Sequence, residues 1–213
     1  MKALLGKKLG MTQVFNQETG EVTPVTVLQI GPCPVVQVKT RDTDGYEAVQ
    51  IGYGDMRPAL ATLPRRGHFR KAGVLPRRWL REVRVEDASQ YEVGQELTVD
   101  LFNDVAKVDV VGVSKGRGFQ GGIKRHGFGT GPKTHGSRNY RQPGAIGQCA
   151  TPARVMKGIR MPGRHGNARV TARNLRVEQV DTENNLLMVG GAVPGARNGL
   201  VLVRVAGKGA GGV

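Results

Sequence analysis

The run VAKVDVVGV (Val105–Val113) is followed directly by SKGRGF (Ser114–Phe119), and two different kinds of sequence meet at this junction. The first run is rich in β-branched residues, which favour an extended strand. The second opens a stretch of 68 residues, between Asp109 and Glu178, that holds 14 Lys or Arg, 14 glycines and no acid. The junction therefore predicts a strand that leads into a strongly basic insertion.

Outside this acid-free stretch the chain is almost electrically neutral. The 213 residues carry 32 Lys and Arg against 17 Asp and Glu, a net charge of +15, but only 18 of these bases and all 17 acids lie outside the stretch. A solvated protein surface keeps some acids for solubility and pairing, so their complete removal predicts a dense polyanion as the partner. Arg outnumbers Lys ten to four in the stretch, and Arg both binds phosphates bidentately and stacks on bases, which suits irregular RNA.

The nearly neutral parts of the chain alternate like short β-strands bounded by Gly, Pro or Asp. They predict a mainly β fold, a barrel or a sandwich. The segments Asp181–Asn184 and Pro194–Gly199 contain the residue types that turns prefer and would connect the last three strands. Besides Val105–Val113, the predicted strands are Val22–Ile30, Val35–Lys39, Glu47–Tyr53, Asn174–Val180, Asn185–Val189 and Leu200–Val205.

The basic insertion begins after one predicted strand and ends before another, so we expect those two strands to be neighbours in the sheet. Residues 1–113 and 169–213 would form the body, with a small inserted α+β region at about 45–100, and residues 114–168 would form a basic extension. The extension has almost no apolar periodicity. It cannot bury enough surface to offset the entropy of ordering, so we expect its partner to order it.

A second basic cluster occupies Arg65–Arg84. It contains eight Lys or Arg, one acid (Glu82) and Trp79, the one tryptophan of the chain. Part of this cluster fits a helix, but Gly73 and Pro76 must interrupt any helix that forms there.

Several motifs in the insertion could suggest other chemistry. Gly116–Gly121 (GRGFQG) matches G-x-G-x-x-G, but a dinucleotide fold also needs an amphipathic helix next and an acid about 20 residues later, and the sequence has neither. His126, His135 and His165 match no zinc-finger spacing, and no carboxylate near Cys149 could orient a catalytic base. We therefore expect no metal, no cofactor and no catalytic activity, with the glycines letting backbone approach phosphates closely.

The two cysteines, Cys33 and Cys149, lie far apart and form no disulfide framework. The N-terminal residues contain no apolar stretch of signal-peptide length, and no run of about 18 apolar residues would span a membrane. These features predict a cytoplasmic protein. The candidate RNA-binding residues are the cations and other polar or aromatic groups of the basic segments: Lys7, Lys8, Arg65, Arg66, Arg70, Lys71, Arg77, Arg78, Lys115, Arg117, Phe119, Lys124, Arg125, His126, Lys133, His135, Arg138, Arg141, Gln148, Arg154, Lys157, Arg160, Arg164, His165 and Arg169.

Seven distinctive strings occur in register along the chain and together resemble the bacterial ribosomal protein L-three family of the large subunit. The resemblance runs nearly from end to end. The strings are GKKLGMT (Gly6–Thr12), GHF with KAGV (Gly67–Val74), VDV with SKGRGF (Val108–Phe119), THG (Thr134–Gly136), PGAIGQ (Pro143–Gln148), GN (Gly166–Asn167) and VPG (Val193–Gly195).

This resemblance implies a β-barrel like that of translation factors, with a small inserted α+β part and a long central extension. It also implies a structural constituent of the large (50S) subunit that binds near the 3′ end of 23S rRNA and nucleates assembly. The body would lie beside ribosomal proteins L-fourteen and L-nineteen, and the extension would reach toward the peptidyl-transferase centre. The residues alone leave open another RNA chaperone or architectural protein, although such a protein usually carries its basic region as a terminal tail.

The chain departs from the family pattern at the tip of the extension. Relatives often read Gly-Gln-Asn-Gln-Thr-Pro where this chain has Gly147–Pro152 (GQCATP), and they often have Trp at the position of His126. In some relatives the glutamine directly before Thr-Pro is methylated on its amide nitrogen. Ala150 occupies that position here and has no amide, so we expect no methylation there and an unmodified Gln148.

Overall fold

The structure is a computed structural model that describes residues 3–15 and 20–207. These residues form two compact units, one made of residues 3–15, 20–113 and 169–207 and the other of residues 114–168. None of the helices in these described ranges is long and apolar enough to cross a bilayer.

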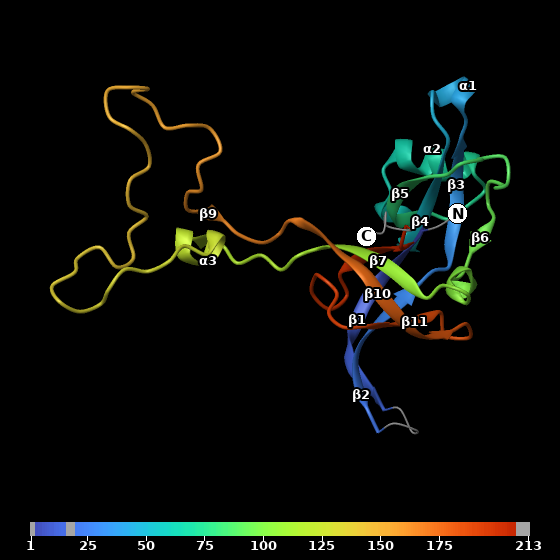
Figure 1. Cartoon of the computed structure of the whole chain (residues 1–213). Coiled ribbons are helices and arrows are strands. Elements are labelled where there is room, and N and C mark those ends of the chain that lie inside the picture. Colours follow the sequence, from blue (N-terminus) through green and yellow to red (C-terminus); the bar gives the residue numbers. More distant parts are fainter. Residues whose placement is uncertain (1–2, 16–19, 208–213) are drawn as a thin grey trace. The chain divides into compact units, whose positions relative to one another are not determined.

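The first unit contains a closed barrel of six antiparallel strands, which confirms the predicted mainly β fold (Figure 1). Each strand pairs with both of its neighbours, so the barrel hides the unpaired backbone groups that an open sheet leaves at its edges. In their order around the barrel the strands are β1 (Ala3–Phe15), β12 (Leu200–Val205), β7 (Lys107–Val113), β10 (Arg169–Asp181), β11 (Leu186–Gly190) and β2 (Val22–Ile30).

The strands on either side of the insertion are neighbours, as the sequence predicts. β7 and β10 pair antiparallel, with Val113 opposite Arg169 and Val110 opposite Ala172. The last residue of β7 therefore lies beside the first residue of β10, and residues 114–168 leave and return at one point of the barrel.

The observed strands agree with most of the predicted ones. β2 and β12 have the predicted bounds, and the turn after Asp181 joins β10 to β11 as an antiparallel hairpin. β1 was not predicted, because Gly6, Gly10 and two lysines interrupt its apolar pattern. It forms because β12 and β2 pair with it on both sides.

A second sheet belongs to the same unit and shares its hydrophobic core. Val35 of β3 and Ile51 of β4 are completely buried in one cluster with Leu4 of β1 and Val108 of β7. Burying one such side chain stabilises the fold by about 1.5–3 kcal/mol. The sheet has the order β5 (Arg77–Arg84), β4 (Ala48–Asp55), β3 (Cys33–Lys39) and β6 (Glu96–Leu97).

Short helices flank this second sheet. The helices are α1 (Arg41–Asp44) and α2 (Leu63–Lys71), with 3-10 turns at Pro58–Leu60 and Val99–Phe102. The Arg65–Arg84 cluster thus splits into α2 and β5, and Gly73, with a φ of +66°, lies in the connection between them. This agrees with the predicted interruption of the helix.

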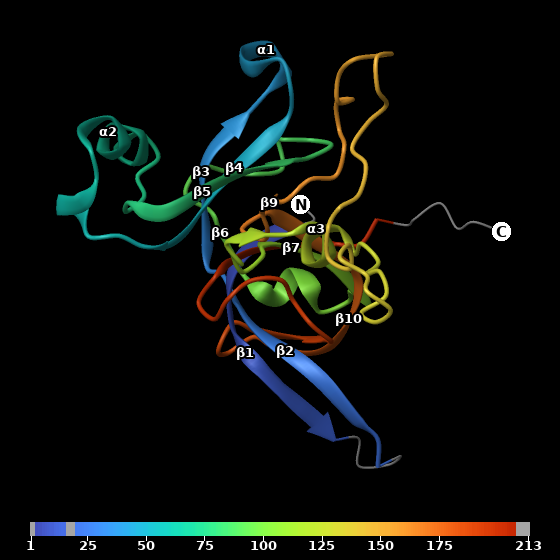
Figure 2. The same ribbon diagram turned by 90° about the vertical axis from the view of Figure 1, so that its left-hand side faces the viewer.

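β1 and β2 extend past the barrel as a two-stranded ribbon (Figures 1 and 2). Met11–Phe15 of β1 pair with β2 alone, since β12 covers only Ala3–Lys7. Phe15 and Val22, which lie opposite each other, are both exposed.

Candidate nucleic-acid interface

The second unit begins and ends in a stem, which we define as residues 114–128 and 159–168. Backbone hydrogen bonds join its two sides. The N–H of Ser114 donates to the carbonyl of Ala168 at 2.9 Å, and the N–H of Asn167 donates to the carbonyl of Ser114 at 3.1 Å. Further along, Arg117 N–H donates to the His165 carbonyl, and His165 N–H donates to the Gly118 carbonyl, both at 2.9 Å.

The far end of the stem has regular structure of its own. β8 (Phe119–Gln120) pairs antiparallel with β9 (Gly163–Arg164), and the helical turn α3 (Gly122–His126) follows β8. Arg125 and His126 both reach the carbonyl of Met161, at 2.7 and 3.0 Å. A single turn of five residues is no amphipathic dinucleotide-fold helix, so the G-x-G-x-x-G pattern acts here as a strand and turn.

Gly166 is required where the chain returns to the barrel. Its φ is +73°, a region that residues with a Cβ avoid, and an added Cβ would overlap the carbonyl oxygen of Lys115. The tight pairing of the two sides of the stem therefore depends on the absence of a side chain at this position.

The remaining residues, 129–158, form a distal loop with little regular structure. The N–H of Gly131 donates to the Tyr140 carbonyl at 3.1 Å, which closes the first part of the loop. Residues 141–151 are all exposed, so the tip that contains Gln148 and Cys149 offers backbone and side chains to an outside partner.

The predicted RNA-binding cations of the second unit lie on its surface. No carboxylate lies between Asp109 and Glu178, so no acidic side chain of the insertion can neutralise them, and those that are exposed are available to a phosphate. Arg125, His126 and His165 are half-buried by their contacts within the stem. The exposed candidates of the unit are Lys115, Arg117, Phe119, Lys124, Lys133, His135, Arg138, Arg141, Gln148, Arg154, Lys157, Arg160 and Arg164, and Arg169 at the start of β10 is exposed as well.

Some arginines of the Arg65–Arg84 cluster have structural partners. The Arg65 guanidinium donates to the carbonyls of Arg77 and Arg78 at 2.9 and 2.6 Å, which joins α2 to β5. The Arg66 guanidinium donates to the carbonyls of Ala59 and Ala61. These guanidinium groups stabilise the fold of the body by satisfying backbone acceptors in its loops.

Other cations of this cluster differ in availability. Arg77 is mostly buried, with 15% of its side chain exposed, and pairs with Asp55 and Glu96. Arg78 is exposed and stacks over the Trp79 ring at 4.9 Å from its centroid. Arg70 and Lys71, at the end of α2, are exposed. Arg78, Arg70 and Lys71 are therefore better placed than Arg77 to bind an outside anion.

The two N-terminal candidates lie in β1, which is part of the barrel. The Nζ of Lys8 donates to the carbonyl of Val193 at 2.7 Å, so this ammonium group holds a barrel loop. Lys7 is half-buried, opposite Gln29 of β2 and Leu200 of β12.

A polar network lies on the second sheet. Lys39 contacts the Glu82 carboxylate and the Tyr46 hydroxyl, both at 2.9 Å, and Tyr46 donates to Glu82 at 2.9 Å. These contacts lower the pKa of Glu82, chiefly through the Lys39 hydrogen bond, and raise that of Lys39, chiefly through the Tyr46 hydrogen bond. His68 Nε2 lies 2.6 Å from Gln50 Oε1, and Gln50 in turn donates to Glu82.

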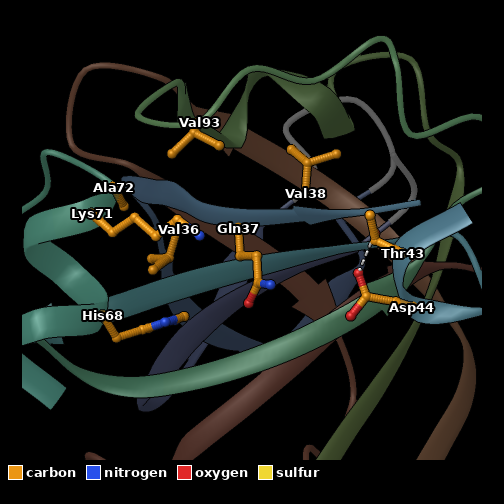
Figure 3. Close-up of a pocket in the computed structure, with 9 residues that line it drawn as sticks. All are labelled: Val36, Gln37, Val38, Thr43, Asp44, His68, Lys71, Ala72 and Val93. Carbon is orange, nitrogen blue, oxygen red and sulfur yellow. Dashed lines mark hydrogen bonds between the residues drawn. The ribbon is translucent and has the colours of Figure 1, made fainter. Parts of the chain in front are cut away.

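A cavity of about 520 Å³ opens beside this network (Figure 3). Its charged groups are of mixed sign, since Asp44 and Lys71 both line it, and Asp44 accepts a hydrogen bond from Thr43 at 2.9 Å. This lining does not match a polyanion, so the cavity is no part of the candidate interface. The lining residues are Val36, Gln37, Val38, Thr43, Asp44, His68, Lys71, Ala72 and Val93.

Within the described ranges, no three His, Cys, Asp or Glu side chains come together as metal ligands. The two cysteines are free thiols in different settings. Cys33 is buried, and this burial raises the pKa of its thiol to about 11, whereas Cys149 is exposed at the tip of the distal loop.

The structure also exposes cations that the sequence analysis did not select. Arg81 and Arg84 lie on β5, and Arg173 lies on β10. Arg173 belongs to the same acid-free stretch as the selected residues, so the charge pattern was a sufficient signal for it. Arg81 and Arg84 belong to the basic cluster Arg65–Arg84, so the charge pattern was a sufficient signal for them as well.

Comparisons with known proteins agree with this architecture. The family model described as "Ribosomal protein L3" matches residues 83–185, which include the whole insertion. A protein of Acidothermus cellulolyticus is 59% identical over 98% of this chain and 94% of its own length. A protein of Corynebacterium jeikeium is 57% identical over 98% of this chain and 96% of its own length. A third protein, from Heliobacterium modesticaldum, is 56% identical over 95% of this chain and 96% of its own length.

All three relatives carry the name "Large ribosomal subunit protein uL3". Identity above one half over nearly the full length of both chains leaves no separate part of the molecule unmatched. With its six-stranded barrel and its acid-free insertion, this chain belongs to the ribosomal protein L3 (uL3) family.

Proposed function

We propose that this chain is a structural constituent of the large ribosomal subunit and that it binds rRNA through residues 114–168. The observation that carries the proposal is the insertion itself, whose cations are exposed except for the half-buried Arg125 and have no carboxylate near them in sequence. Such a surface repels itself until a polyanion neutralises it. The names of the relatives, which are large-subunit proteins, support the same partner.

The position of the insertion favours a ribosomal role over a free RNA chaperone. A chaperone usually presents its basic region as a terminal tail, whereas this insertion is anchored at both ends to paired strands of a closed barrel. Two anchored ends fix where the basic segment leaves the body. Association with large subunits that survives moderate salt in a sedimentation experiment supports the ribosomal role, and its absence would favour the chaperone.

The salt dependence of binding tests the RNA contact directly. If about ten cations of the insertion each neutralise one phosphate, the slope of log K against log salt changes by about −0.9 for each contact on a duplex-like partner. A variant in which a short Gly-Ser linker replaces residues 115–164 should lose most of this slope on a large-subunit rRNA transcript. The variant keeps the barrel, because the strands that flank the linker are neighbours.

A matched control removes charge from the body instead. Arg70→Gln with Lys71→Gln replaces two exposed cations of α2 and should reduce the slope by at most the two contacts removed. A slope that survives deletion of the insertion but collapses in this control would assign the binding to the body and contradict the proposal.

The finer parts of the proposal follow the family resemblance. The protein would bind near the 3′ end of 23S rRNA, act early in subunit assembly and lie beside ribosomal proteins L-fourteen and L-nineteen. Its distal loop would approach the peptidyl-transferase centre. Exposure of every residue from 141 to 151 supports a role for this loop in contacts outside the chain.

Gly147 allows a test of the tip. A Cβ at this position would meet only the Arg154 carbonyl, at an ordinary 3.5 Å, so Gly147→Val adds bulk toward the outside without straining the chain. Ribosomes with this change should alter their sensitivity to drugs of the peptidyl-transferase centre. Normal drug binding and peptidyl transfer in the Gly147 variant would contradict the placement of the tip.

A further inference from the structure

We propose that Phe119, together with Arg164, forms a stacking site for one unpaired RNA base. This inference rests on the proposed function and specifies one contact within it. The side chain of Phe119 is 73% exposed, although it belongs to the strand β8 of the stem. Removing a phenyl ring from water is energetically favourable. The exposure of the Phe119 ring therefore indicates a surface that a partner covers.

Hydrogen bonds on both sides of Phe119 hold its backbone in place. Phe119 lies between Gly118, whose carbonyl accepts a hydrogen bond from His165 N–H at 2.9 Å, and Gln120, whose side chain donates to the Arg117 carbonyl at 2.5 Å. β8 pairs with β9, and α3 begins two residues after β8 ends. A base that stacks here would meet a ring on a preformed scaffold, which lowers the ordering cost of binding.

Arg164 supplies the second half of the site. It lies directly opposite Phe119 in the antiparallel pair of β8 and β9. Directly opposite residues of such a pair project from the same face, with Cβ atoms about 4.5–5.5 Å apart. The guanidinium of Arg164, which is exposed, can therefore bind the phosphate of a nucleotide whose base covers the Phe119 ring.

The charge around the ring favours a nucleic acid over a protein as the cover. Lys115, Arg117 and Lys124 are exposed within five residues of Phe119 in sequence, and no acid lies in the insertion. A protein surface would have to be strongly acidic to match these cations, whereas every nucleotide brings both an anion and a π-face.

The other phenylalanine of the insertion has an internal role. The ring of Phe128 covers Gly122, where an added Cβ would lie 2.6 Å from the ring, and it stacks near His126 at 5.8 Å between centroids. Phe128 therefore packs the stem. Phe119 lacks such a role, and its ring stays available for a base.

Affinity for a large-subunit rRNA transcript tests the site in the full-length protein. Phe119→Leu keeps an apolar side chain without a π-face and should weaken binding measurably, by at most about 5- to 150-fold, the loss expected when a stacking ring is replaced by alanine. It should leave the slope of log K against log salt unchanged, because no phosphate contact is removed. Phe119→Tyr keeps the stack and should bind like the unchanged protein.

Two further variants serve as controls. Arg164→Gln should reduce the salt slope by about 0.7 to 0.9, the share of one phosphate contact. Phe15→Leu makes the same change at a comparably exposed ring, 61% exposed, in the uncharged ribbon of the barrel, and should leave the affinity unchanged.

Ultraviolet cross-linking of the same complex gives an independent measurement, because irradiation can form a covalent bond directly between a base and the ring on which it stacks. Trypsin cleaves after Arg117 and Lys124 and releases the peptide Gly118–Lys124, which should carry a nucleotide adduct localised to Phe119. Unchanged affinity of Phe119→Leu, an equal loss in Phe119→Tyr, or adducts confined to other residues would each overturn the stacking site.

The outcomes separate this site from the proposed function. If deletion of residues 115–164 flattens the salt slope while Phe119→Leu has no effect, rRNA binding stands and the stacking site is wrong. If the unchanged protein shows no salt-dependent rRNA binding, the proposed function itself fails. Unchanged RNA affinity combined with loss of a neighbouring protein from reconstituted particles would place a protein on the ring and overturn the inference.

Discussion

The carboxylate of Asp109 in β7 accepts two hydrogen bonds from the guanidinium of Arg204 in β12, from Nε at 3.2 Å and from Nη2 at 2.9 Å. Its other oxygen accepts the backbone N–H of Asn174 at 2.9 Å. Asn174 has a φ of +56° and lies where β10 shifts its register against β7. One buried acid thus joins three adjacent strands at the base of the insertion.

Removal of this acid should destabilise the barrel. Asp109→Ala leaves the Asn174 N–H and the half-exposed Arg204 without their acceptor, and we expect a loss of about 1.5–3 kcal/mol, as for hydrogen bonds to charged groups. Urea denaturation followed by circular dichroism measures this loss. Asp104→Ala, at an exposed position earlier in the chain, serves as the control, and equal effects of the two changes would contradict the structural role of Asp109.

The two thiols should react at very different rates. Burial raises the pKa of Cys33 to about 11, and its sulfur lies 3.5 Å from the Leu5 carbonyl, whereas Cys149 is exposed. At neutral pH a chromogenic disulfide reagent should modify one thiol quickly and the second only after unfolding. Cys149→Ser should remove the fast phase, and two fast equivalents in the native protein would show that Cys33 is accessible.

Hydrogen exchange on the RNA-free protein should divide the insertion into two parts. The barrel amides of β2 and β12 should be strongly protected, the stem amides of Arg117 and His165 should be partly protected, and residues 129–158 should exchange quickly. Gly166→Ala should abolish the stem protection, because a Cβ there would overlap the Lys115 carbonyl.

Gly121→Ala provides the matched control for that variant. Its φ is −72°, and no atom lies within 4 Å of an added Cβ, so stem protection should persist. Protection that is equal throughout residues 114–168, or absent from the stem as well, would contradict this division.

The Lys39–Glu82 contact should make stability depend on acid pH. Hydrogen bonds, first from Lys39 and then from Tyr46, lower the pKa of Glu82 below its ordinary value of 4.5. A lowered folded-state pKa contributes stability above that ordinary value, and the contribution is lost as the pH falls through the folded-state pKa. The unchanged protein should therefore lose more stability below pH 4.5 than Glu82→Gln does, as thermal unfolding across that range would measure. Equal losses of stability in both proteins would show that the Lys39–Glu82 contact does not contribute to the pH dependence.

The tip of the distal loop should lack the amide methyl group that the family resemblance implies before Thr-Pro. Ala150 has no amide nitrogen, and Gln148, the nearest glutamine on that side, is displaced by two residues, which shifts an amide by several ångströms, at about 3.3–3.6 Å per residue. Peptide mass spectrometry of Gln142–Arg154 should show an unmodified peptide. A mass increase of one methyl group at Gln148 would mean that the modifying enzyme accepts the shifted position.

Much of the body could be predicted from local patterns. The alternation of β-branched residues predicted β2 and β12 with their observed bounds, because side chains of a strand alternate between core and solvent. β1 could not be found this way, since its glycines and lysines hide the alternation. Its pairing with β12, which lies almost 200 residues later, decides that it is a strand.

The candidate interface could also be predicted only in part. The sequence predicted the basic insertion and the neighbouring strands that hold it. It did not distinguish Arg65, Arg66 and Arg77, whose guanidinium groups have partners within the body, from cations such as Arg78 that are better placed for an outside anion. It also gave no sign that Phe119 faces outward while Phe128 packs inside the stem. Both distinctions depend on contacts between parts of the chain that no local pattern records.

The sequence by itself determined the β class, the position of the insertion and the sign of its charge, because strand alternation and the count of ionisable groups are local properties. Tertiary structure alone decided the closure of the barrel, the three strands joined through Asp109 and the pairing of Phe119 with Arg164. The physical reason is that a charge exists wherever its residue occurs, whereas a hydrogen bond or a shared strand face requires two distant residues to be held within a few ångströms of each other.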